Sequence, residues 1–169
     1  MSPVLHLRKH LSDRPAAEMV SGISVREMLV PGDIAEWLAL RERAMFGERP
    51  AVRSWGEVDF RREMMAKTWW RSDRAWVACC DESPGEFIGA VTLAMREGRS
   101  IRVPVVHWLL VDPARRRRGI GRMLIAHLER VAWGDGWREV QLETHAGWAA
   151  AVACYQSMGY ASLEADLSR

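Results

Sequence analysis

Hydrophobic and polar positions follow one another along the chain in a pattern that predicts a mixed series of strands and helices. Compact apolar runs bounded by turn residues predict about six strands, at residues 23–30, 75–80, 87–95, 103–111, 137–144 and 160–167. Apolar residues three or four positions apart predict about four helices, at residues 33–46, 55–70, 119–133 and 149–158. The order β-α-α-β-β-β-α-β-α-β predicts one α/β domain with a mixed sheet over residues 23–169.

The first 22 residues have weak periodicity and are interrupted by Pro15. We therefore expect residues 1–22 to form a tail or a loosely docked extension of the domain. A second methionine, Met19, stands just before the first expected strand. N-terminal sequencing of the native protein would show which methionine begins it.

Composition supports a folded domain and argues against several classes of protein. Hydrophobic residues make up 49% and charged residues 27% of 169 residues, which suits one globular domain. Cys79, Cys80 and Cys154 are odd in number and lack metal-ligand spacing, so a disulfide framework and a zinc site are not expected. The start of the chain lacks a signal-peptide pattern, and no run approaches the roughly 18 apolar residues of a membrane span. We expect a cytoplasmic protein with no membrane partner.

The positive charge of the chain is concentrated in one place. Lys and Arg total 24 against 22 acidic residues, and four of the arginines are contiguous at residues 115–118. Without these four, 20 basic residues would face 22 acidic ones, a net charge of −2. A protein that coats nucleic acid carries a broader basic excess, so we expect no nucleic-acid partner. A nucleic-acid-binding protein that uses the arginine run is kept as an alternative hypothesis.

The segment at residues 111–121, which reads VDPARRRRGIG, carries the clearest chemistry. It lies between an expected buried strand and an expected amphipathic helix. Gly119 and Gly121 let the backbone at the helix start approach a ligand, and the free N–H groups there favour an anion such as phosphate. Neighbouring arginines add charge-assisted hydrogen bonds.

Two common phosphate-binding patterns do not fit this segment. The string GxxxxGK[ST] does not occur in the chain. The dinucleotide pattern GxGxxG would need a third glycine where Leu124 stands, and it would come early in the chain rather than late.

The segment instead resembles motif A of the GNAT superfamily of acyl-CoA-dependent N-acetyltransferases, [R/Q]xxGx[G/A], preceded by VxP. Downstream, QLET at residues 141–144, Ala151 and CYQSMGY at residues 154–160 resemble motif B of the family. GEFIGA at residues 85–90 is similar to the strand that precedes motif A. The resemblance covers residues 23–160, with both motifs in order at family-like spacing.

This resemblance implies a fold and a cofactor. The fold would be a GNAT-like central mixed sheet, splayed in the middle where residues 137–144 diverge, with helices on both faces. Acetyl-CoA would bind as co-substrate without a metal, its pantetheine arm along the end of one strand and its pyrophosphate on backbone amides. The cofactor-binding residues implied are Leu109, Leu110, Val111, Arg116, Arg117, Arg118, Gly119, Ile120, Gly121 and Arg122.

The resemblance also implies transfer of an acetyl group to a primary amine of a small molecule or peptide by direct attack. The amine would enter over residues 47–53. Tyr155 matches the motif B tyrosine and is the expected general acid, since a phenol with a pKa of about 10 is protonated at neutral pH. Its position on a helix alone would favour a core aromatic residue, and the match to motif B reverses that preference.

His107 is the candidate general base, four residues before Val111, where relatives often carry Glu. Strand alternation would place His107, Leu109 and Val111 on one face unless a bulge shifts the phase. A hydrogen-bonded core histidine is the alternative. Glu143 and His145 are reserve bases, and proton loss to solvent without a base is a further alternative.

Two departures from the family pattern define the competing hypothesis. Trp148 stands where family members often have an Asn that helps to hold the cofactor. The end of the chain leaves little room for a final hairpin strand, so that strand is absent or comes from a partner in a homodimer. Both features motivate the alternative of a non-catalytic acyl-CoA-binding sensor or assembly module.

Overall fold

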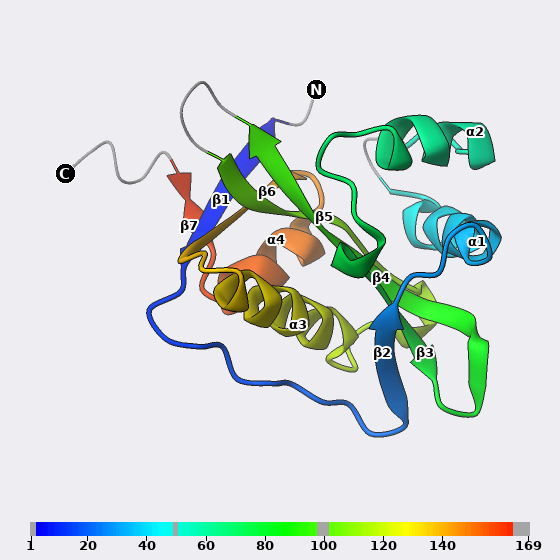
Figure 1. The fold of residues 1–169 in the computed structure, drawn as a ribbon, viewed down its shortest axis with the longest axis horizontal. Coiled ribbons are helices and arrows are strands. Elements are labelled where there is room, and N and C mark those ends of the chain that lie inside the picture. Colours follow the sequence, from blue (N-terminus) through cyan, green and yellow to red (C-terminus); the bar gives the residue numbers. More distant parts are fainter. Residues whose placement is uncertain (1–2, 49–50, 98–101, 164–169) are drawn as a thin grey trace.

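The computed structural model describes residues 3–48, 51–97 and 102–163 of the chain. A seven-stranded sheet in the order β2-β3-β4-β5-β6-β1-β7 forms its centre (Figure 1). The strands are β1 (Val4–His10), β2 (Ile23–Glu27), β3 (Ala75–Cys80), β4 (Ser83–Glu97), β5 (Arg102–Val111), β6 (Glu139–His145) and β7 (Ala161–Ser162). All neighbouring strands are antiparallel except β5 and β6, which are parallel, so the sheet is mixed.

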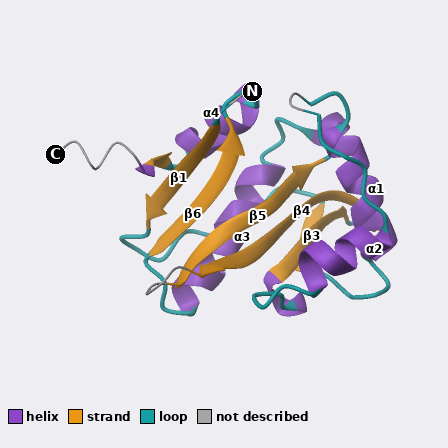
Figure 2. Cartoon of the chain, turned by 90° about the horizontal axis from the view of Figure 1, so that it is seen from above, coloured by secondary structure: helices purple, strands orange, loops and turns teal. Residues whose placement is uncertain are grey.

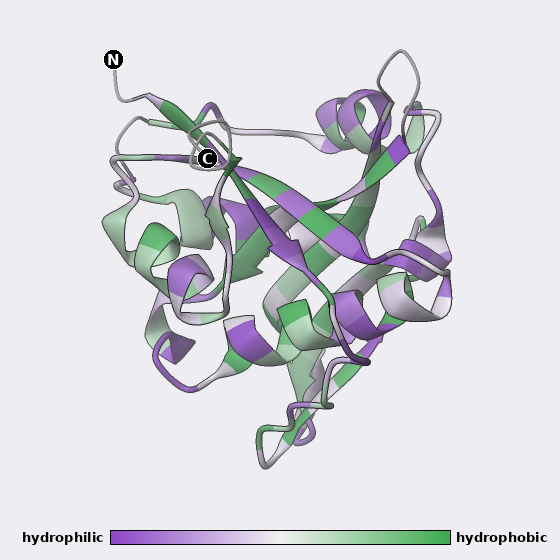
Figure 3. Cartoon of the chain, turned by 90° about the vertical axis from the view of Figure 1, so that its left-hand side faces the viewer, coloured by the Kyte–Doolittle hydropathy of each residue, from purple (hydrophilic) through white to green (hydrophobic). Residues whose placement is uncertain are grey.

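Four α-helices cover the two faces of the sheet. They are α1 (Ile34–Met45), α2 (Glu57–Phe60, continued by a π-helical turn at Arg61–Met65), α3 (Ile120–Gly134) and α4 (Ala149–Ser157). One core packs the sheet against α3 and α4, and the other packs it against α1 and α2. Figure 2 shows α3 behind β5, with α1 and α2 beside β3 and β4. Figure 3 shows hydrophobic and hydrophilic residues alternating along strands, the pattern expected when the two faces differ in burial.

The expected elements from residue 23 onward are confirmed in type and order, with shifted ends. The largest shift is in the second helix, predicted over 55–70 but found from Glu57 to Met65. The predicted cap, Ser54, donates its hydroxyl to Glu42 instead, and the Asp59 carboxylate accepts the Gly56 N–H at 2.9 Å. Of the last predicted strand, residues 164–167 lie outside the described residues.

The prediction of a tail or loosely docked segment at the N-terminus is wrong for residues 4–10. These residues form β1, which lies between β6 and β7 and pairs antiparallel with β6 from Val4 to His10. The chain itself therefore supplies an inserted strand at the place where the sequence suggested an absent strand or a partner's strand. After β1 the chain runs past α3 to β2 (Figure 1).

A buried ionic cluster anchors β1 to the domain. The Lys9 ammonium lies 2.7 Å from one carboxylate oxygen of Glu129 on α3, and the Tyr160 hydroxyl donates to the other at 2.9 Å. Glu129 is only 2% exposed, so both of its oxygens need these partners. The charge of Lys9 on the inward face hides the alternation that would have marked this segment as a strand.

Candidate functional site

A groove opens where β5 and β6 separate. The two strands pair only at Val105–Gln141 and Val106–Leu142, and beyond these residues they diverge. The space between them is a cavity of about 1280 Å³ that extends over the start of α3 and along α4. The implied splaying of the sheet is therefore present, and it leaves the second half of β5 unpaired with β6.

The groove collects almost all of the candidate residues. Tyr155, His107 and Glu143 line it, from α4, β5 and β6 respectively. The predicted cofactor-binding residues that also line it are Leu109, Leu110, Val111, Arg116, Arg117, Gly119, Ile120, Gly121 and Arg122. Arg118 is exposed and is not among the lining residues.

The loop before α3 is held in shape by an aspartate and an arginine. The Asp112 carboxylate accepts the Ala114 N–H at 2.9 Å and so caps the short turn at Pro113–Arg115. Arg43 on α1 donates from Nε to the same carboxylate at 2.8 Å and from Nη2 to the Phe87 carbonyl at 2.9 Å. Sequence reasoning missed Arg43, because an arginine in a helix carries no signal of a partner 69 residues away.

Backbone N–H groups at the start of α3 are available for an anion. The first helical hydrogen bond runs from the Met123 N–H to the Gly119 carbonyl, so the N–H groups just before Met123 have no helical acceptor. Arg117 and Gly119 adopt left-handed backbone conformations, at φ +62° and +83°. A Cβ atom on Gly121 would come no closer than 3.7 Å to Val111. The bare backbone there forms a cradle that faces the groove.

The arginines near the cradle differ in whether their side chains have partners. Arg116 turns its side chain to the end of α1, where Nη2 donates to the Ala44 carbonyl at 2.9 Å, so this side chain holds the loop in place. Within the described residues, Arg117 and Arg118 have no hydrogen bond or ion pair from their side chains, which leaves two free cations beside the cradle. Arg122 reaches Glu18 and Ser157, both at 3.4 Å.

A β-bulge in β5 separates His107 from Leu109 and Val111. The pairing with β4 passes from Ala90–Leu110 to Thr92–His107, which places an extra residue in β5, and Trp108 has φ +48°. The His107 ring lies 5.2 Å from that of Trp69, on the α1 side of the sheet, whereas Leu109 and Val111 lie beside Gly121 on α3. These three residues therefore do not share a face, because a bulge, the stated exception to strand alternation, is present.

The environment of His107 keeps its imidazole neutral. Burial lowers its pKa to about 4, and the charge of Lys67 contributes in the same direction. A neutral imidazole has a free lone pair at pH 7, but a pKa this low makes it a weak base.

We expect this histidine to make the protein less stable in mild acid. The unfolded imidazole takes up a proton below its ordinary pKa of about 6.5, while the folded one stays neutral down to about 4, so stability falls as pH falls through this window. The contribution reaches about 3 kcal/mol at pH 4. Urea unfolding at pH 7, 5.5 and 4 would measure it, and His107→Phe should flatten the slope. An equal slope in the variant would contradict this assignment.

Tyr155 has the environment of a proton donor. It is 8% exposed on α4, and burial raises its pKa further above the usual value, with the neighbouring Cys154 adding to the effect. Its hydroxyl makes no hydrogen bond to another described residue, and its ring meets Tyr160 edge-on at 6.1 Å. The phenol is therefore protonated and borders the groove with an unused donor.

Glu143 already has partners for its carboxylate, which makes it a poorer candidate for a general base. Its carboxylate lies 2.5 Å from Arg96 and 3.3 Å from the Nδ1 of His6, a residue of the N-terminal strand that sequence reasoning had left out of the site. Beside it, His145 Nδ1 and Trp148 Nε1 are buried without hydrogen-bond partners in the described part of the chain. Trp148 therefore places an indole N–H without a hydrogen-bond partner at the position where family members often have an asparagine.

Comparison with known proteins places this site in a family. Residues 35–160 match the Acetyltransferase (GNAT) family, and the chain belongs to that family. The fold agrees, since a GCN5-related N-acetyltransferase from Sphaerobacter thermophilus superposes with a TM-score of 0.70 at 21% identity, over 94% of this chain and 48% of that one. A structure of AAC(6')-Iy in complex with the bisubstrate analogue CoA-S-monomethyl-acetylneamine gives a TM-score of 0.62 at 21% identity, over 82% and 90% of the two chains.

Among curated proteins, the chain is 30% identical to mycothiol acetyltransferase of Thermobispora bispora over 160 residues. That match covers 90% of this chain and 51% of the relative, so the chain spans about half the length of that relative. It is also 35% identical to human N-acetyltransferase 8 over 85 residues, which is 50% of this chain and 37% of that protein.

No helix in the part of the chain that the structure describes is both long and apolar enough to cross a membrane. No group of three or more His, Cys, Asp or Glu side chains in the described ranges could hold a metal ion.

Proposed function

We propose that this chain transfers the acetyl group of acetyl-CoA to a primary amine of a small molecule or peptide. The observation that carries the proposal is one continuous groove that joins the backbone cradle before α3 to the Tyr155 hydroxyl on α4. An anionic cofactor suits the cradle because Arg117 and Arg118 stand beside it without partners among the described residues. Relatives named as mycothiol and aminoglycoside acetyltransferases support an amine acceptor.

In this proposal the chain supplies position and a proton. The amine nitrogen attacks the thioester carbonyl, the C–S bond breaks, and the departing sulfur takes a proton from Tyr155. The nitrogen gives up its own proton to His107 or to water, and Tyr155 is reprotonated from solvent. Glu48 and Glu143 line the groove, but each is already paired with an arginine, Arg116 and Arg96 respectively.

The proposal is tested first by binding and turnover. Acetyl-CoA should raise the melting temperature, and a thiol reagent should detect free CoA when aminoglycosides, polyamines, amino acids and peptides are offered in turn. Binding without turnover for any of these amines would favour the alternative, a non-catalytic acyl-CoA-binding module.

Tyr155→Phe should lower kcat by about 100-fold, because a general acid contributes roughly 10²–10⁴-fold. The Kd of acetyl-CoA should stay within about twofold, since the ring is retained. Tyr160→Phe is the matched control: it removes a buried hydroxyl beside the same helix and lowers stability without lowering kcat. Unchanged turnover in Tyr155→Phe would show that another group protonates the sulfur.

A further inference from the structure

Arg41 is a buried arginine that packs against two tryptophan rings, and these rings also contact each other edge-on, with their centroids 5.0 Å apart. It lies on α1, is 1% exposed, and its guanidinium carbon is 4.3 Å from the ring centroid of Trp55 and 4.7 Å from that of Trp108. Trp37 lies at 6.2 Å from each of these two rings. Stacking on aromatic faces is a geometry for which the planar guanidinium is suited and an ammonium is not.

The polar contacts of this arginine are few for a buried cation. Nη2 donates to the Arg53 carbonyl at 3.0 Å and Nη1 lies 3.3 Å from Glu42. Its Nε has no partner, and neither does the Trp108 indole nitrogen, in the part of the chain that the structure describes. A buried cation with an unsatisfied donor is unfavourable, and proteins keep such arrangements mainly at functional sites.

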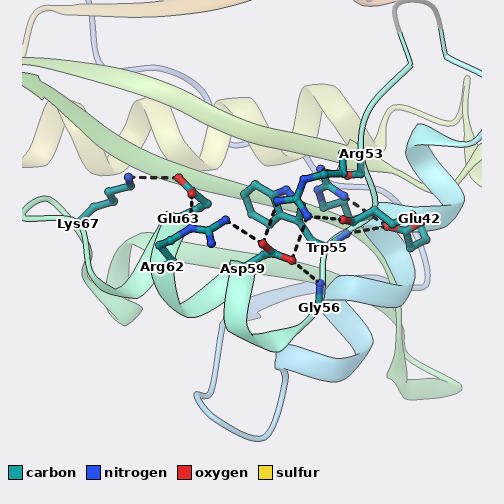
Figure 4. Close-up of polar contacts among 10 residues, drawn as sticks. Glu42, Arg53, Trp55, Gly56, Asp59, Arg62, Glu63 and Lys67 are labelled. Carbon is teal, nitrogen blue, oxygen red and sulfur yellow. Dashed lines mark hydrogen bonds and ion pairs between the residues drawn. The ribbon is translucent and has the colours of Figure 1, made fainter.

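The loop that carries Trp55 is fixed on both sides. Figure 4 shows Arg53 paired with Asp59 on α2, while the Trp55 N–H donates to Glu42 on α1. Trp55 is therefore held in place, and its contact with Trp108, together with Arg41 packed against both rings, links this loop to β5. The loop lies next to residues 47–53, over which the amine was expected to enter.

Trp108 is the strained residue of the β5 bulge. A bulky side chain at φ +48° is an outlier, and such a conformation persists only where its surroundings hold it. The ring of Trp108 contacts Arg41, Trp37 and Trp55 on the α1 side, and both Trp108 and the next residue, Leu109, line the groove. Releasing the ring would let the bulge relax and would move the backbone at the groove.

We propose that Arg41 is a positioning residue for acyl transfer, which fixes the β5 bulge by holding Trp108 against Trp55. The inference rests on the proposed acetyltransferase function. Arg41 does not line the groove, so its effect passes through Trp108. A displacement of about 1 Å at a reacting centre costs up to about 100-fold in rate, whereas binding of the distant pyrophosphate is unaffected.

The experiment compares Arg41→Met, Arg41→Lys and Leu40→Ala. Leu40 is fully buried in the same helix and core, and its apolar side chain has neither a charge nor a hydrogen-bond donor, so Leu40→Ala controls for lost stability. We expect Arg41→Met to lower kcat by about 10- to 100-fold with the Kd of acetyl-CoA within twofold, and Arg41→Lys to fall between it and wild type. If Arg41→Met lowers kcat no more than Leu40→Ala does, the proposal is wrong.

A second readout does not depend on turnover. Backbone amide resonances of Trp108 and Leu109 should move in the free Arg41→Met protein and stay in place in Leu40→Ala. If wild type transfers no acetyl group to any amine, the proposed function fails, while these resonances still decide whether Arg41 sets the bulge. Unmoved resonances in Arg41→Met would overturn the positioning role, even if the enzyme is active.

Discussion

A chain that starts at Met19 should lose its cooperative unfolding transition. It lacks β1, so the backbone of β6 loses its antiparallel partner and two leucines that are 3% and 4% exposed, Leu7 and Leu11, are removed from the core. Each leucine contributes about 2 kcal/mol of burial, and the loss of Lys9 leaves Glu129 buried with its charge unpaired, at about 3–5 kcal/mol. Together these losses approach the 5–15 kcal/mol that holds a typical domain.

Thermal and urea unfolding of the truncated and full chains would measure this effect. Two point variants in the full chain separate the effect of losing a buried side chain from the effect of shortening the chain. Leu7→Ala should cost about 2–4 kcal/mol, while Val4→Ala on the same strand, where the side chain is 47% exposed, should cost under about 1 kcal/mol. A truncated chain that melts within a few degrees of the full one would show that β1 is dispensable.

Gly121→Trp should abolish acetyl-CoA binding, with a loss of affinity above about 100-fold, and leave the domain folded. The position faces the groove, and a Cβ there meets only ordinary contacts with Val111 and Leu109, at 3.7 and 3.9 Å. An indole would therefore extend into the cradle rather than into the core. It would fill the space where N–H groups at the helix start are to meet the pyrophosphate.

The matched control is Gly121→Ala, whose methyl group fits the observed space. It should keep the melting temperature and weaken binding by only a few-fold, as measured by calorimetric titration with acetyl-CoA. Retention of affinity in Gly121→Trp would place the cofactor elsewhere. Salt-sensitive binding of random DNA that survives the same substitution would instead favour the nucleic-acid hypothesis.

The parts of the site that sequence could predict are those carried by local chemistry. The loop at residues 111–121 combines a strand end, a glycine pair and a helix start, and all of these features depend on near neighbours in the chain. The same holds for Tyr155, whose helix follows from apolar spacing and Gly159. The resemblance to family motifs A and B predicted the two ends of the groove, which are the loop before α3 and Tyr155 on α4.

The parts that sequence could not predict depend on contacts between distant segments. The bulge at Trp108 reverses the alternation in β5, and nothing in the apolar run 103–111 marks it. Arg116 stands at the motif position, yet its side chain bonds the Ala44 carbonyl, because the end of α1 happens to lie beside it. β1 escaped notice because Lys9 occupies an inward position that only a buried carboxylate from α3 makes tolerable.

The place of β1 also sets the order in which the molecule can be assembled. This strand is synthesised before every other described element, but its partners in β6 begin at Glu139. An emerging chain must keep residues 4–10 unpaired until nearly the whole domain has been made, and the contact that then forms joins segments far apart in the chain. We therefore expect the sheet to close only after synthesis of β6, so that incomplete chains expose an open edge to chaperones and to one another.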